Sequence, residues 1–255
     1  MLATVASPRT RIRWQRLVAA ARFALAIGCA VALVFRYLWG IGWVEPLNFV
    51  AYLTIQSNIA FVLVSAVSAV FALRGWPTKH LDRVRAGVLT CTVTAGIVFA
   101  AILQQSLARG VTVYLPPSDV VLHFVLPVIA IADWVLTPRT RPSVRVLVFV
   151  LGYVGTWGVI TLFRGAATGW YPYYFLDPGQ TDGPGELILL SAIAVAVFVV
   201  VGLAVILAPR PVRWWAALRR GRGFGGRPRE ERRRSGRREP RHPHRPQHPA
   251  APDAR

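Results

Sequence analysis

The chain of 255 residues is 54% hydrophobic and only 16% charged, whereas a typical soluble domain is about 45–50% apolar and about 25% charged. Its formal net charge of +19 suggests a nucleic-acid partner at first, but half of the 30 basic residues lie in residues 210–255. Charge and hydrophobicity therefore belong to different parts of the chain, and a single soluble globular domain is excluded.

Six apolar segments follow one another along the chain, each near the ~20 residues that a helix needs to cross a ~30 Å hydrocarbon core. In chain order they are residues 17–38, 48–73, 86–107, 120–136, 144–163 and 186–207. The sequence therefore predicts an all-α polytopic membrane protein with six transmembrane helices in residues 17–208.

Basic residues predict the orientation of these spans, because Lys and Arg concentrate in cytoplasmic loops. Every second connection between spans is rich in Lys and Arg. The connections on the opposite side of the membrane carry only three such residues, Arg36, Arg109 and Arg164. The basic stretches are the N-terminal arm (1–16), residues 74–85, residues 139–145 and the tail (209–255). Both termini are thus expected to be cytoplasmic, with the protein in the cytoplasmic membrane.

The tail is rich in Arg, Pro, Gly and His and poor in aliphatic residues. Such a composition cannot bury enough apolar surface to fold, so we expect the tail to be disordered. Trp214 and Trp215, flanked by arginines, suit an interfacial anchor that binds anionic lipid headgroups. Nucleic-acid binding by the Arg-rich run is the alternative, and no specific nucleic-acid partner is predicted.

The densest polar set within a span is Y-L-T-I-Q-S-N at residues 52–58. Polar groups in a membrane span are costly and are functional candidates for that reason. Thr54 and Asn58 share one helix face, with Ser57 beside them, and we expect this face to point into the bundle. Thr54 lies ~9 Å below the outer side and His123 ~5–6 Å below it, at the rise of an α-helix. The hydroxyl and the imidazole therefore occupy one shallow layer.

A hydroxyl is a weak nucleophile until a base removes its proton, and His is the commonest base. Thr54 with His123 is therefore the minimal pair for acyl transfer in the outer leaflet. Asn58, Gln56 or Arg164 would hold an oxyanion or a carboxylate. The competing interpretation is structural, because Ser and Thr in spans often bond the backbone four residues back or join helices.

Asp133 lies ~15 Å below His123 by the same helical rise, too far to orient the imidazole. We expect a structural ion pair between Asp133 and Arg139 or Arg141. The stretch at residues 170–178 has two prolines, and four of its first five residues are aromatic. It is either an aromatic belt or a lid over a lipid-binding cavity, with Tyr173 and Asp177 as candidate substrate contacts.

Four motifs together carry a resemblance to a known family. They are Y-L-T-I-Q-S-N (52–58), L-H-F-V-L-P with D-W (122–134), R-G (164–165) and W-Y-P-Y-Y-F-L-D (170–177). Over residues 17–208 the chain resembles the bacterial Pr-six-Pr family of six-span membrane proteins. That family is similar to the animal androgen-induced and androgen-dependent TFPI-regulating proteins, which are threonine hydrolases of fatty acid esters. The resemblance implies a nucleophile at Thr54 and a catalytic His at His123.

We therefore predict an intramembrane lipid-ester hydrolase that acts on fatty acyl esters without a metal or another cofactor. Thr54 is its predicted nucleophile and His123 its general base, and membrane lipids are its expected partners. The predicted substrate-binding residues are Asn58, Gln56, Arg164, Tyr173 and Asp177. The alternative is a non-catalytic six-span protein, either a carrier of lipids or small molecules or a scaffold.

Overall fold

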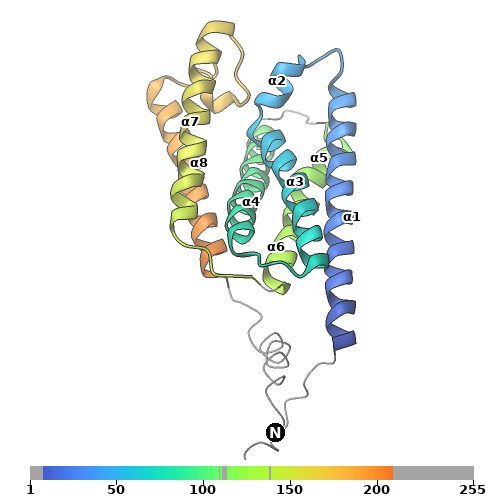
Figure 1. Cartoon of the computed structure of the whole chain (residues 1–255). Helices are drawn as coiled ribbons and strands as arrows, with labels where there is room; N and C mark the ends of the chain where they lie inside the picture. Colours follow the sequence, from blue (N-terminus) through green and yellow to red (C-terminus); the bar gives the residue numbers. More distant parts are fainter. Residues whose placement is uncertain (1–7, 109, 111–113, 138, 209–255) are drawn as a thin grey trace, which may run out of the picture.

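The computed structural model describes residues 8–108, 110, 114–137 and 139–208, and these residues fold as a helical bundle without strands (Figure 1). Six helices are long and apolar enough to cross a membrane: Ile12–Gly40, Leu53–Arg74, Lys79–Ala108, Pro117–Leu136, Arg145–Thr168 and Pro184–Leu207. The predicted six-span, all-α fold is confirmed. The tail (209–255), with its expected disorder and lipid contacts, lies outside the described residues.

The helical elements extend beyond most of the apolar segments. They are α1 (Pro8–Gly40), α2 (Pro46–Ala51), α3 (Leu53–Arg74), α4 (Lys79–Ala108), α5 (Pro117–Val120), the π-helix η1 (Val121–Val125), α6 (Leu126–Leu136), α7 (Arg145–Thr168), the 3₁₀-helix η2 (Tyr174–Leu176) and α8 (Pro184–Leu207). Because α1 begins at Pro8, the second half of the expected N-terminal arm is helical. Polar residues continue the helix there, although they add nothing to its hydropathy.

Two of the spans are interrupted near one end of the bundle. The predicted span at residues 48–73 is divided at Tyr52, whose extended backbone (φ −65°, ψ 126°) separates α2 from α3. The fourth span is built from α5, η1 and α6 in direct succession. The chain begins α1 and ends α8 at one end, which we call the terminal end, whereas α2 and the α7–α8 connection lie at the distal end (Figure 1).

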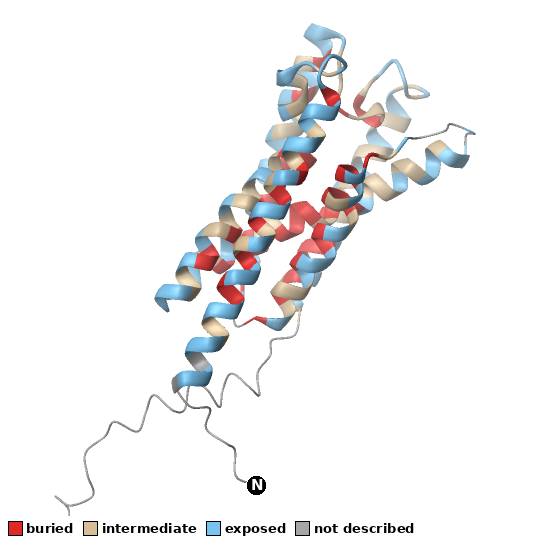
Figure 2. Ribbon diagram, turned by 90° about the vertical axis from the view of Figure 1, so that its right-hand side faces the viewer, coloured by how far each residue is buried: buried red, intermediate tan, exposed pale blue. Residues whose placement is uncertain are grey.

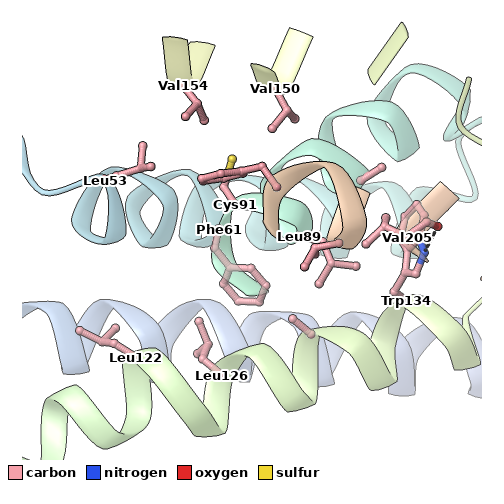
Figure 3. Packing of buried hydrophobic residues seen from close by; sticks show 14 of the residues in the cluster. Leu53, Phe61, Leu89, Cys91, Leu122, Leu126, Trp134, Val150, Val154 and Val205 are labelled. Carbon is pink, nitrogen blue, oxygen red and sulfur yellow. Dashed lines mark hydrogen bonds between the residues drawn. The ribbon is translucent and has the colours of Figure 1, made fainter. Parts of the chain in front are cut away.

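The six spans pack around α4. Helix α1 packs along α3, α3 packs on α4, and α7 and α8 both contact α4 and each other. Buried residues face the interior, and exposed ones cover the outside (Figure 2). The inner cluster includes Leu89, Leu126, Trp134, Val150 and Val205, which come from α4, α6, α7 and α8 (Figure 3). The outside is also apolar, with Phe149 and Phe163 more than three-quarters exposed, as a lipid-facing surface requires.

A buried ion network joins three helices near the terminal end. Asp133 of α6 accepts hydrogen bonds from Nε of Arg22 at 3.1 Å and from Nη2 of Arg85 at 2.6 Å. Arg85 also pairs with the fully buried Asp82 at 3.0 Å. The prediction that Arg139 or Arg141 would pair with Asp133 is wrong. Arg139 instead donates to the Trp134 carbonyl and stacks on the Trp134 ring, because α6 ends between Asp133 and Arg139 while α1 and α4 bring arginines to the depth of Asp133.

Candidate functional site

A cavity of about 500 Å³ lies between the helices in the distal half of the bundle. Side chains from α1, α2, α3, α4, α5, η1, α7, α8 and the α7–α8 connection line it, and most of its surface is apolar. Its volume falls within the ~300–1,000 Å³ that is usual for small-molecule sites. Three of the residues singled out from the sequence, Thr54, His123 and Tyr173, line this cavity.

His123 is buried in the π-helix η1 and held from two sides. Its Nδ1 lies 3.0 Å from the carbonyl oxygen of Asp119, one turn earlier. The ring of Phe99 stacks on the imidazole at 3.8 Å between centroids. A ring nitrogen that bonds a carbonyl must carry the proton, so in the neutral imidazole Nε2 is the unprotonated nitrogen that accepts a proton. The imidazole is thereby prepared to act as a base.

The backbone around His123 departs from an α-helix for a reason visible in the sequence. In an α-helix, the N–H four residues later normally donates to each carbonyl. Pro127 lacks an N–H, so it cannot donate in this way to the carbonyl of His123. That carbonyl faces α4, where a Cβ on Gly96 would lie 2.3 Å from its oxygen. Only glycine at position 96 lets the two helices approach this closely. π-Helical turns are frequent at functional sites.

Thr54 is the second residue of α3, directly after the backbone break at Tyr52. Its side chain is buried, and its Oγ1 lies 3.4 Å from the hydroxyl oxygen of Tyr173. Its carbonyl oxygen accepts hydrogen bonds from Oγ of Ser57 and from Nδ2 of Asn58, both at 2.9 Å. Within the described residues, Thr54 and His123 line the same cavity without a hydrogen bond between their side chains.

Tyr173 brings the α7–α8 connection over this site. Its ring contacts Tyr52, Trp157 and Phe175 at 5.3–5.9 Å between centroids. Burial away from water raises the pKa of the Tyr173 hydroxyl above its ordinary value, while the hydrogen bond with Thr54 opposes the shift. A raised pKa keeps the phenol neutral, so Tyr173 carries a proton that it can donate to an oxygen beside Thr54.

An ion pair that the sequence analysis did not single out also lines the cavity. Nε of Arg36, from α1, lies 2.7 Å from Oδ1 of Asp119. Asp119 thus connects Arg36 through its carboxylate to His123 through its backbone carbonyl. Two signals were present in the sequence, since Asp119 stands four residues before His123 and Arg36 is one of two arginines in the apolar segment at residues 17–38.

Four other sequence-predicted residues lie outside the cavity lining. Asn58 is fully buried and bonds the Thr54 carbonyl, and Gln56 lies between the Val50 carbonyl and the Tyr153 hydroxyl. Arg164 donates to Asn48 and stacks on Trp170. Asp177 accepts from Gly179 N and Gln180 Nε2 within its own turn. The contacts seen for these four residues are structural ones.

The site is therefore a polar triad of Thr54, His123 and Tyr173 at the wall of an apolar cavity in a six-span bundle. In the part of the chain that the structure describes, no group of three or more His, Cys, Asp or Glu side chains is placed to hold a metal ion. Comparison of the chain with protein-family models, curated proteins and solved structures gave no match.

Proposed function

We propose that this protein is an intramembrane hydrolase of fatty acyl esters, with Thr54 as nucleophile and His123 as general base. The observation that carries the proposal is the shared cavity: a Thr hydroxyl, a His imidazole with Nε2 available and a neutral Tyr hydroxyl line one apolar space. An apolar space within spanning helices suits an acyl chain. The basic stretches of the sequence favour a distal end that faces the outside of the cytoplasmic membrane.

The chemistry needs only these side chains, the ester and water. Oγ1 of Thr54 attacks the ester carbonyl carbon while Nε2 of His123 takes the hydroxyl proton. The tetrahedral oxyanion accepts a hydrogen bond from Tyr173, which lies beside Thr54. Collapse breaks the ester C–O bond, and His123 returns the proton to the departing alcohol. Water, deprotonated by His123, then hydrolyses the acyl-threonine and restores the free hydroxyl.

The second candidate is a non-catalytic lipid carrier, and one observation favours it. The hydroxyl of Thr54 pairs with Tyr173 and not with His123. The hydrolase proposal requires Thr54 and His123 to come into contact when substrate binds, and such tightening is common because catalytic hydrogen bonds are often long before the substrate arrives.

Labelling of the full-length protein in lipid nanodiscs by a fluorophosphonate probe separates the two candidates. We expect covalent labelling that is lost in Thr54→Ala and reduced about 10²–10⁴-fold in rate in His123→Gln, as for removal of a general base. Thr156→Ala is the matched control, because Thr156 is an exposed residue on α7 outside the cavity lining. Labelling that survives Thr54→Ala would overturn the mechanism. Tight lipid binding with neither labelling nor ester hydrolysis would identify a carrier.

A further inference from the structure

We propose that the ester cleaved here has a single acyl chain and a short alcohol part that carries an anionic oxygen group, either phosphate or carboxylate, held by Arg36. This inference rests on the proposed function and adds a substrate class to it. Three features of the cavity carry it: the order of groups along its depth, the unused donors of Arg36 and its volume.

The groups that line the cavity follow a simple order in depth. Asp119, which pairs with Arg36, lies four residues, or ~6 Å, on the distal side of His123 in the fourth span. Phe99 of α4 stacks on His123, and the lining continues along α4 towards the terminal end for five more residues, or ~7.5 Å, to Thr94. The charged pair thus lies about one helical turn to the distal side of the proposed base, and the cavity extends more than one turn to its other side.

This order indicates that the acyl part of the ester is long and the alcohol part is short. The ester carbon must lie beside Thr54 and His123 for attack. On the terminal side of that level the lining is mostly apolar, with side chains such as Val154 and Phe198, which suit the acyl chain. Above it, only about one turn separates the base from Arg36. An alcohol part that ends at Arg36 is therefore short.

Arg36 has hydrogen-bond donors to spare. It pairs with Asp119 through Nε, and the described residues provide no other partner for its two Nη groups. A guanidinium has five N–H donors in a planar fork that matches carboxylate and phosphate oxygens. Its side chain is 27% exposed, so an anion reaches it without losing all of its hydration. Asp119 holds the guanidinium in place and leaves the Nη side for the ligand.

The volume suits a ligand with one acyl chain. A cavity of about 500 Å³ lies in the middle of the ~300–1,000 Å³ range of sites that hold one small molecule.

The test compares hydrolysis of palmitoyl esters that share an acyl chain and differ in the alcohol, at equal mole fraction in mixed micelles with the full-length protein. The panel contains the ester of glycerol 3-phosphate, the zwitterionic phosphocholine relative, the ester of glycolic acid, the ester of glycerol, and the ester of a hydroxystearic acid with its hydroxyl at mid-chain. We expect kcat/KM for a short anionic ester to exceed that for the glycerol ester about 10-fold or more, the range of a hydrogen bond to a charged group. The glycerol phosphate and glycolate arms separate phosphate from carboxylate.

Substitution of Arg36 locates the preference. In Arg36→Gln the ratio of the anionic to the glycerol ester should fall to about 1, and Arg36→Lys should restore part of it. The matched control is Arg145→Gln, which removes one positive charge from an exposed position at the other end of the bundle. A wild-type ratio near 1, a preference for the mid-chain ester, or a ratio that Arg36→Gln leaves unchanged would overturn the inference.

Binding of uncleavable ether analogues separates this inference from the proposed hydrolysis. If no ester in the panel is hydrolysed, the proposed function fails, and binding of hexadecyl glycerol 3-phosphate and hexadecyl glycerol to the wild-type and Arg36→Gln proteins is measured instead. Preference for the phosphate compound that disappears in Arg36→Gln supports the anion site on its own. Equal binding of the two ethers by the wild-type protein overturns it.

Discussion

At the scale of single residues, Tyr173 has the most specific proposed role, because its hydroxyl is 3.4 Å from that of Thr54. We predict that Tyr173→Phe lowers kcat about 10²–10³-fold, the range for one oxyanion donor, with little change in KM. The phenyl ring keeps the contacts with Tyr52, Trp157 and Phe175, so the cavity should retain its shape. Steady-state kinetics on a short-chain ester would measure the effect.

The pH dependence of the Tyr173 effect follows from its raised pKa. A tyrosine donates a hydrogen bond only below its pKa, and burial moves that limit upward, above the model-peptide value of ~10. The ratio of wild-type to Tyr173→Phe kcat should therefore stay constant from about pH 7 to about pH 9. A rise in KM with kcat unchanged would assign Tyr173 to substrate binding alone.

The sequence predicted part of this site because helix depth can be counted from residue numbers. Thr54 and His123 were placed in one layer by that count, and both line the cavity. Depth does not give the direction in which a side chain points around its helix. Asn58 shares the face of Thr54, yet it packs against Cys29 of α1, and the Arg36–Asp119 pair depends on how α1 and α5 are brought together.

At the scale of elements, the contact between α4 and η1 sets the position of the proposed base. We predict that Gly96→Ala lowers the free energy of unfolding by about 1–3 kcal/mol, as overpacking does, because the new methyl group would lie 2.3 Å from the His123 carbonyl oxygen. It should also lower the rate of Thr54 acylation, since η1 must move. Thermal unfolding in detergent and probe labelling measure the two effects.

Gly152→Ala in α7 is the control for this substitution. A Cβ at Gly152 would meet nothing within 4 Å, and alanine has the higher helix propensity by about 1 kcal/mol. Stability should therefore be unchanged or slightly higher in Gly152→Ala. Equal unfolding temperatures for Gly96→Ala and Gly152→Ala would contradict the close approach of α4 and η1.

The helices were predictable from hydropathy because spanning segments must be long and apolar. The interruptions of the second and fourth spans were not predictable from hydropathy. The break at Tyr52 and the π-helix at His123 arise where side chains and neighbouring helices replace hydrogen bonds that the backbone would otherwise form within the helix. Gln56 Nε2, for example, donates to the Val50 carbonyl just before the break. Such compensation depends on tertiary contacts, which a window of hydropathy does not contain.

At the scale of the whole molecule, polar side chains are divided between two ends. The distal half contains the cavity, with the Arg36–Asp119 pair and the polar triad at its wall. The terminal half contains the ion network of Arg22, Arg85, Asp82 and Asp133, which joins α1, α4 and α6. We expect the network to keep α1, α4 and α6 together while a ligand enters the cavity in the other half of the bundle.

This division predicts opposite effects for substitutions at the two ends. Asp133→Asn removes the carboxylate that Arg22 and Arg85 share, and breaking a buried ion pair by losing one partner typically costs about 3–5 kcal/mol. Unfolding in detergent should therefore begin at a markedly lower temperature, and less protein should accumulate in the membrane. Asp119→Asn at the distal end should lower hydrolysis far more than stability, because Asp119, although buried, has one ion-pair partner, and this partner, Arg36, is 27% exposed. The two partners of Asp133, Arg22 and Arg85, are each only 6% exposed. If both substitutions lowered the unfolding temperature equally, the two ends would form one structural unit, and the proposed separation of a stabilising half from a ligand-binding half would be wrong.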